Sequence, residues 1–80
     1  MTDELATQIR DAIKNNLIEC RIEHDMTQTD VGKLVGKSKN AVASWEQGLS
    51  LPDITTLYRL AQYYKKTLDF MMGVEKDADN

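Results

Sequence analysis

Hydrophobic residues recur at spacings of three and four in successive stretches of this chain, a pattern typical of amphipathic helices. The first stretch runs from Asp3 to about Glu23 and predicts one long helix, capped by Thr2, or two helices that break at Asn15-Asn16. Its apolar residues fall on one stripe that is expected to pack inward: Leu5, Ile9, Ala12, Ile13, Leu17 and Cys20.

The segment from Thr27 to Gly48, TQTDVGKLVGKSKNAVASWEQG, predicts two short helices joined by a tight turn. Thr27 and Ser38 are hydroxyl residues of the kind that cap helix N-termini. Gly36 lies between them, where the first of the two helices must end in a left-handed conformation that glycine adopts without steric cost. The apolar residues expected to face inward are Val31, Leu34, Val35, Ala41, Val42 and Trp45.

Two further helices follow a loop. Pro52 suits the first turn of a helix, because its missing N–H has no partner there. The inward face of this helix is expected to contain Ile54, Leu57, Tyr58, Leu60, Ala61 and Tyr64. Thr67 then caps a short helix, Leu68 to Met72, which Gly73 terminates. The pattern predicts an all-α bundle of five helices.

The motif residues resemble those of the Cro and lambda-repressor-like (XRE-type) helix-turn-helix domains: Gln28, Gly36 and the Trp-Glu-x-Gly run at 45–48. The resemblance extends from about Ile13 to Gly73. It implies a compact five-helix lambda-repressor-like bundle with the helix-turn-helix at the second and third helices. The chain then divides into an N-terminal helical extension (1–12), a DNA-binding domain (13–73) and an acidic tail expected to be disordered (74–80).

Two positions depart from the family pattern. Gly32 stands where alanine is usual, and glycine permits close helix approach at a cost of about 1 kcal/mol of helix propensity. Lys37 stands after the turn glycine, where an apolar residue is common. We expect Lys37 to turn outward toward a phosphate.

The resemblance implies that the second motif helix lies in the major groove of DNA and reads base edges with its first turns. The candidate base-reading residues are Ser38, Lys39, Asn40, Ala43 and Ser44. An asparagine can pair with adenine through two hydrogen bonds, a lysine can donate to guanine, and an alanine methyl can pack on a thymine methyl. For Asn40 a local helix cap is the alternative interpretation.

Other polar residues of the motif are candidates for contacts with the DNA backbone. Gln28 begins the first motif helix, whose N-terminus can hold a phosphate, although Gln28 could also be an ordinary exposed residue. Further candidates, which would position the protein without specifying sequence, are Lys33, Lys37, Gln47, Gly48 and Ser50. The resemblance also implies a structural ion pair between Arg21 and Glu46.

The net charge of −3 is unusual for a DNA-binding protein, because phosphate contacts normally leave a basic footprint. Its distribution weakens this objection. Residues 10–72 hold nine basic and eight acidic residues, a net charge of +1, whereas the two ends together carry −4. The alternative is that the lysines at 33, 37 and 39 form only a solvated face.

Composition restricts the remaining possibilities. Eighty residues make one small domain, the single Cys20 cannot form an internal disulfide, and no apolar run approaches the roughly 20 residues needed to span a bilayer. His24 is the single histidine and Cys20 falls on the apolar stripe, so neither a metal site nor a Cys-His nucleophile is indicated. We expect a cytoplasmic protein that is not an enzyme and needs no cofactor.

The sequence therefore predicts a transcriptional regulator that represses by binding an operator in double-stranded DNA. One domain of this size buries too little surface to be very selective, so we expect it to bind as a homodimer. The candidate dimer surface is more apolar than a small monomer needs to expose: Leu68, Phe70, Met71, Met72 and Val74. The N-terminal extension, through Leu5 and Ile9, is a second candidate for self-association. The alternative function is a protein-interaction module on the same fold, such as an antitoxin or anti-repressor.

Overall fold

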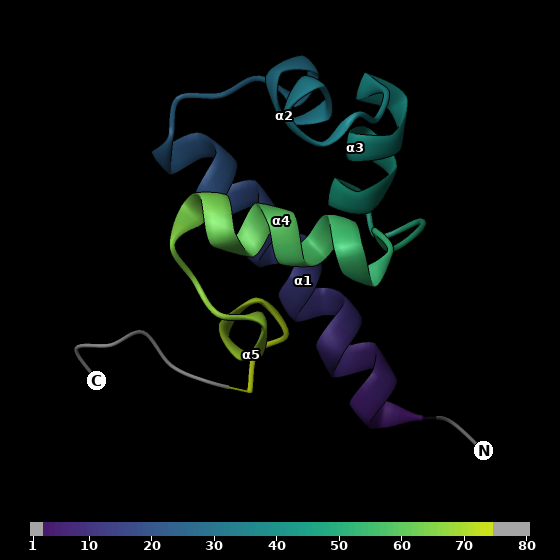
Figure 1. Cartoon of the computed structure of the whole chain (residues 1–80). Coiled ribbons are helices and arrows are strands. Elements are labelled where there is room, and N and C mark those ends of the chain that lie inside the picture. The colour runs from purple at the N-terminus through teal and green to yellow at the C-terminus, as the bar shows by residue number, and fades with distance from the viewer. Residues whose placement is uncertain (1–2, 75–80) are drawn as a thin grey trace.

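Five helices make up the computed structural model, which describes residues 3–74 (Figure 1). They are α1 (Glu4–Glu23), α2 (Gln28–Val35), α3 (Lys39–Glu46), α4 (Ile54–Tyr64) and α5 (Leu68–Met71). Helix α1 packs on α3 and α5, while α2 packs on α3 and α4. The described residues contain no strand, so the prediction of an all-α five-helix bundle is confirmed.

Helix α1 is continuous and does not break at Asn15-Asn16. Its N-terminal cap is Asp3, rather than the predicted Thr2, because Asp3 Oδ1 accepts a hydrogen bond from the Ala6 N–H at 3.1 Å. The Asn16 side chain instead links α1 to α5: Nδ2 donates to the carbonyls of Phe70 at 3.0 Å and Met71 at 3.2 Å. The first turns of α1 extend away from the other helices (Figure 1).

Every helix contributes to one hydrophobic core. The buried apolar residues are Ile13, Leu17, Cys20, Val31, Val35, Val42, Trp45, Leu57, Leu60, Ala61, Tyr64 and Met71. Trp45 therefore packs inside the bundle, as its spacing predicts. Since α2 and α3 bury only a few residues each, their positions depend on the helices behind them.

Four apolar residues predicted to face inward are exposed instead. Leu5 is 61% exposed, Leu34 42%, Ile54 64% and Tyr58 50%. Helical spacing identifies one side of a helix, but it does not say how much of that side its neighbours cover. Leu5 lies in the projecting turns of α1, while Ile54 and Tyr58 lie in the first half of α4 (Figure 1).

The boundaries of α4 and α5 also differ slightly from the prediction. Pro52 precedes the cap of α4 instead of standing in its first turn, and Asp53 is the cap, with Oδ1 accepting from the Thr56 N–H at 2.8 Å. Thr67 caps α5 as predicted, and the helix ends at Met71, one residue early. Residues 75–80, most of the predicted tail, lie outside the described residues.

Candidate nucleic-acid interface

The two motif helices begin and end where their capping residues predict. Thr27 Oγ1 accepts from the Asp30 N–H at 3.0 Å, and Asp30 Oδ2 accepts from the Thr27 N–H at 2.9 Å, which closes a capping box. Ser38 Oγ accepts from the Ala41 N–H at 3.0 Å. Gly36 is left-handed, with φ of 71°, and ends α2. Local side-chain chemistry thus sets the turn between α2 and α3.

Gly32 allows the turn to fold back closely on α2. The Lys37 N–H donates to the Gly32 carbonyl at 2.8 Å, and a Cβ at position 32 would lie 2.4 Å from the Lys37 carbonyl oxygen. An alanine here would therefore force the backbone of the turn to move. This close approach favours a residue without a Cβ, which explains a glycine at position 32 in spite of its low helix propensity.

The five candidate base-reading residues differ in how much of their side chain is available. Lys39 and Asn40 are exposed, and within residues 3–74 their side chains form no hydrogen bond or ion pair. Ser38 acts as the cap of α3, so the alternative interpretation of Asn40 as that cap is wrong. Ala43 and Ser44 are half-buried, and Ser44 Oγ lies 2.7 Å from Ser50 Oγ.

Three exposed lysines lie on or next to the motif, at positions 33, 37 and 39. Lys37 Nζ lies 3.5 Å from Asp53 Oδ2 at the start of α4, in an exposed ion pair. The pKa of Asp53 is lowered below its usual 3.8, first by hydrogen bonding with Thr56 and to a smaller extent by Lys37. Lys33 remains exposed on α2, where it contributes, after the hydrogen bonds of the helix cap, to the lowered pKa of Asp30 without forming an ion pair with it. Two of the three lysines thus form no ion pair within residues 3–74.

The loop after α3 supplies the other backbone candidates. Gln47 is the C-terminal cap of α3 and is exposed, and Gly48 adopts a left-handed conformation with φ of 77°. Ser50 is exposed and is held to α3 through its hydroxyl contact with Ser44. The structure therefore fixes this loop against the C-terminal half of α3.

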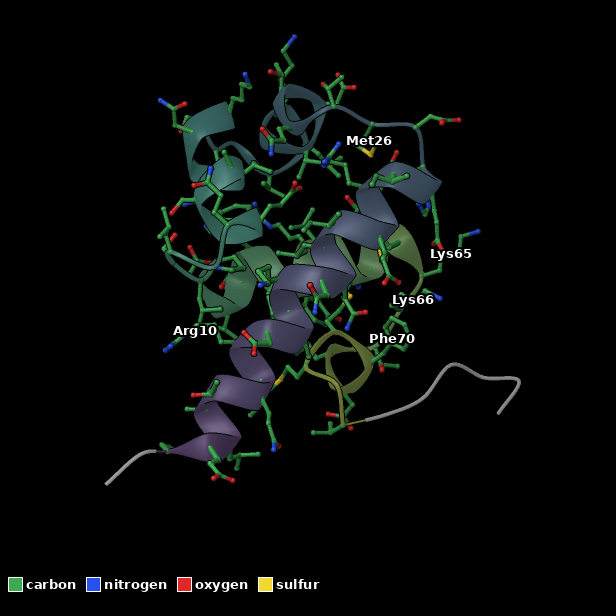
Figure 2. The ribbon with its side chains drawn as sticks, turned by 180° about the vertical axis from the view of Figure 1, so that it is seen from behind. Arg10, Met26, Lys65, Lys66 and Phe70 are labelled. Carbon is green, nitrogen blue, oxygen red and sulfur yellow. The ribbon has the colours of Figure 1, made fainter. Side chains whose placement is uncertain are left out.

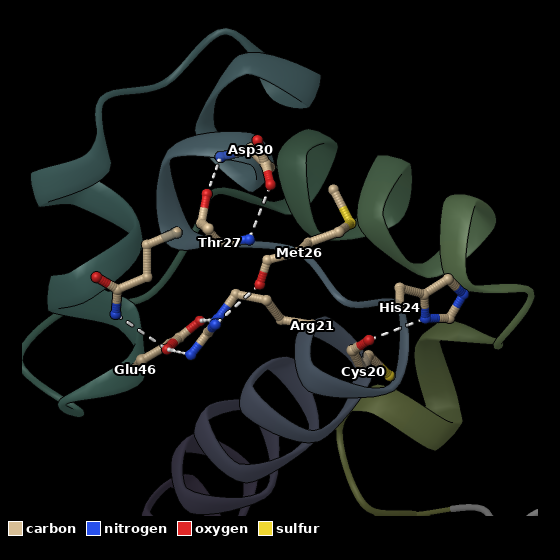
Figure 3. Close-up of polar contacts among 8 residues, drawn as sticks. Cys20, Arg21, His24, Met26, Thr27, Asp30 and Glu46 are labelled. Atoms are coloured by element: carbon tan, nitrogen blue, oxygen red, sulfur yellow. Dashed lines mark hydrogen bonds and ion pairs between the residues drawn. The ribbon is translucent and has the colours of Figure 1, made fainter.

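The Arg21–Glu46 pair implied by the resemblance is present. Arg21 Nε donates to Glu46 Oε2 at 2.7 Å and Nη2 donates to Oε1 at 3.0 Å, so the pair is bidentate (Figure 3). The hydrogen bond with Glu46 raises the pKa of Arg21. The side chains are only 19% and 7% exposed. Arg21 therefore neutralises the charge of the Glu46 carboxylate, which reduces its repulsion of a nearby phosphate.

Gln28 joins this pair, in a contact that the sequence did not predict. Its Nε2 donates to Glu46 Oε1 at 3.1 Å, and the Gln28 residue is half-buried at the start of α2. Positions 28 and 46 lie on different helices, so no local spacing marks the contact. Gln28 is thus a positioned residue rather than an ordinary exposed one.

The candidate dimer surface is smaller than the sequence suggests. Leu68, Phe70 and Met72 are partly buried against the core and Met71 is fully buried, whereas Val74 is 61% exposed. Lys66 Nζ lies 4.6 Å from the centre of the Phe70 ring, a cation–π contact visible in Figure 2. Much of the apolar character of α5 therefore serves the core of the monomer.

His24 lies at the opposite end of α1 from the extension. Its Nδ1 is 2.9 Å from the Cys20 carbonyl oxygen (Figure 3). The centre of the His24 ring is 4.8 Å from that of Tyr64. Burial is the main cause that raises the pKa of Tyr64 to about 12. Residues 3–74 contain no group of three His, Cys, Asp or Glu side chains placed to hold a metal. None of the helices described is long and apolar enough to cross a membrane.

The geometry defines a helix-turn-helix protein, and the chain belongs to the helix-turn-helix family, whose model matches residues 17–71. Over 46 residues the chain is 33% identical to the cryptic phage CTXphi transcriptional repressor RstR of Vibrio cholerae. This match covers 58% of the chain and 41% of the repressor, so the chain matches less than half the length of that relative. No solved structure matches the chain.

Proposed function

We propose that this protein is a transcriptional regulator that binds double-stranded DNA in a sequence-specific manner and represses by occupying an operator. The observation that carries the proposal is the start of α3, where Lys39 and Asn40 are exposed and form no side-chain hydrogen bond or ion pair within residues 3–74. Ser38 caps this helix, and Gly36 ends the helix before it. Membership of the helix-turn-helix family and the similarity to a phage transcriptional repressor support it.

In this proposal α3 lies in the major groove. Asn40 pairs with an adenine, Lys39 donates to a guanine, and the Ala43 methyl packs on a thymine methyl. The Ser38 and Ser44 hydroxyls, already engaged within the protein, contribute through their remaining hydrogen-bonding capacity. Lys39 and Asn40 therefore provide most of the direct readout.

The DNA backbone is held by residues around α3. Gln28, Lys33 and Lys37 approach from α2 and the turn, while Gln47, Gly48 and Ser50 approach from the loop. Lys37 exchanges its exposed contact with Asp53 for a phosphate. Because the net charge of the chain is −3, each monomer binds with modest affinity, and the lysine–phosphate contacts make that affinity salt-sensitive.

We also propose that the protein binds as a homodimer, because one short α3 reads few base pairs. A two-fold symmetric dimer would place two α3 helices on half-sites about one helical turn of DNA apart. Val74 and the exposed parts of Leu68, Phe70 and Met72 are the proposed contact surface. The protein would act in a bacterial cytoplasm or in a phage-infected host.

The decisive experiment is selection of random duplex DNA by the purified full chain at about 100 mM salt, a concentration that leaves phosphate contacts effective, followed by sequencing of the bound fraction. A palindromic motif supports a dimeric operator-binding protein, and its spacing gives the dimer geometry. A folded protein that enriches no sequence, also at lower salt, contradicts the proposal.

The alternative is a protein-interaction module, such as an antitoxin or anti-repressor, on the same fold. One observation favours it: Leu5 is 61% exposed on turns of α1 that project from the bundle (Figure 1). In that case Leu5→Glu abolishes partner binding while Asn40→Ala leaves it unchanged. The opposite result excludes the extension as the binding site.

A further inference from the structure

We propose that Glu46 is a positioning residue that turns the Gln28 amide so that its N–H group faces a DNA phosphate. The inference rests on the proposed DNA-binding function and adds the residue that prepares one backbone contact. Its basis is the hydrogen bond from Gln28 Nε2 to Glu46 Oε1 at 3.1 Å.

A glutamine amide has two different ends. Its nitrogen carries two N–H donors and its oxygen is an acceptor, whereas a phosphate oxygen only accepts. An amide that rotates freely presents its oxygen to the phosphate for part of the time, and the two oxygens repel each other. Glu46, as a carboxylate, also only accepts, so it holds the nitrogen end of Gln28 on its own side. One N–H binds Glu46 and the second remains for the phosphate.

Glu46 is itself fixed in place by α1. Arg21 donates two hydrogen bonds to the carboxylate, and its third nitrogen, Nη1, donates to the Met26 carbonyl at 3.0 Å (Figure 3). Met26 lies two residues before Gln28, so these bonds close a ring through Met26, Arg21, Glu46 and Gln28. The Glu46 side chain is only 7% exposed, and water has little access to replace any of its partners.

This arrangement joins α1, the start of α2 and the end of α3. Each carboxylate oxygen has a defined role: Oε2 accepts from Arg21, while Oε1 accepts from both Arg21 and Gln28. A side chain at position 46 that no longer places an acceptor at the Oε1 position therefore releases the Gln28 amide, while Arg21 Nε can still donate to Oε2.

The test uses the full chain and a duplex recovered by the selection described above. Single methylphosphonates, which remove the charge of one phosphate, are introduced in turn along a half-site. At the phosphate that Gln28 binds, the wild type is expected to lose about tenfold in affinity, the usual scale of a hydrogen bond to a charged group. In Gln28→Ala that loss disappears, which identifies the phosphate.

Two variants of Glu46 then test the positioning role. Glu46→Gln keeps the size of the side chain but has one acceptor oxygen for three donors. Glu46→Asp keeps the charge but is one CH2 shorter and cannot serve both Arg21 and Gln28. In both we expect the methylphosphonate loss at the Gln28 phosphate to fall to about twofold or less, while losses at other phosphates persist. Gln8→Ala, on the exposed start of α1, is the matched control and behaves like the wild type.

The outcomes separate a positioning role from a purely structural one. A Glu46 variant that binds DNA more weakly or melts earlier, yet keeps the full methylphosphonate loss at the Gln28 phosphate, overturns the inference. If neither variant folds, NMR of the wild-type complex decides: protection of both Gln28 side-chain N–H protons from solvent exchange supports it, and protection of one contradicts it. Absence of any DNA binding by the wild type instead overturns the proposed function.

Discussion

The side-chain amide of Asn16 in α1 donates to the Phe70 carbonyl at 3.0 Å and to the Met71 carbonyl at 3.2 Å, which links the first helix to the last. Asn16→Ala removes both bonds and is expected to lower the free energy of unfolding by about 1–2 kcal/mol. Asn15→Ala is the matched control, because Asn15 is exposed, and should change stability by less than about 0.5 kcal/mol. Urea unfolding measures both, and equal effects would refute the assignment.

Arg21→Ala is expected to destabilise the fold without a selective effect on sequence preference. It leaves the largely buried Glu46 carboxylate without its bidentate partner, at a cost of about 3 kcal/mol, the lower end for breaking a buried pair. Thermal unfolding and the DNA selection, repeated on the variant, measure the two effects. An unchanged melting temperature combined with an altered operator preference would contradict this prediction.

Gly32→Ala should destabilise the protein, although alanine has the higher helix propensity. The new Cβ would lie 2.4 Å from the Lys37 carbonyl oxygen, and relief of this overlap costs about 1–3 kcal/mol, the range for an overpacked site. Thr29→Ala, an exposed position of the same helix, provides the control and should be neutral within about 0.5 kcal/mol. A stabilised Gly32→Ala protein would show that the turn relaxes freely.

Acid should weaken the fold through Asp30 and Asp53, whose pKa values are lowered below the usual 3.8 mainly by hydrogen bonding within their helix caps. A lowered carboxylate pKa stabilises the folded state above the unfolded value, and this contribution is lost as the pH falls below 3.8 through the folded value. In the double variant Asp30→Asn with Asp53→Asn, asparagine can still cap but does not titrate. Melting temperatures between pH 7 and acid, in roughly half-unit steps, should fall less steeply for this variant than for the wild type.

Asn40→Ala is expected to weaken operator binding by about 1–3 kcal/mol and to relax preference at a single base pair. Lys37→Ala should instead weaken binding to all sequences and reduce the salt slope by about 1, because a phosphate contact carries no sequence information. Binding to the selected duplex and to its single-base variants, across a salt series, distinguishes the two. An unchanged base preference in Asn40→Ala would remove Asn40 from the base-reading residues.

The sequence predicted the motif well because its signals are local. A cap such as Thr27 or Ser38 acts on a backbone N–H three residues away, and Gly36 acts on its own backbone conformation, so spacing alone locates them. The core positions of α3 and the second half of α4 follow from helical periodicity for the same reason.

The errors arise where structure depends on distant parts of the chain. Leu34 and Ile54 have the right spacing for burial, but only the arrangement of the neighbouring helices determines whether they are covered. The bonds from Asn16 to α5 and from Gln28 to Glu46 connect separate helices, so neither has a local signature. The helices and caps that frame the candidate site were therefore predictable from the sequence, but the contacts between its helices were not.

Lys39 and Asn40 are exposed and form no side-chain hydrogen bond within residues 3–74, whereas Ser38 caps α3. This difference has an evolutionary consequence. If α3 reads DNA as proposed, substitutions at positions 39 and 40 change what it recognises at little cost to folding, because these side chains form no hydrogen bond or ion pair with the rest of the described chain. On the proposed function, related proteins would then diverge in their operators through two neighbouring codons, while the rest of the helix-turn-helix stays unchanged.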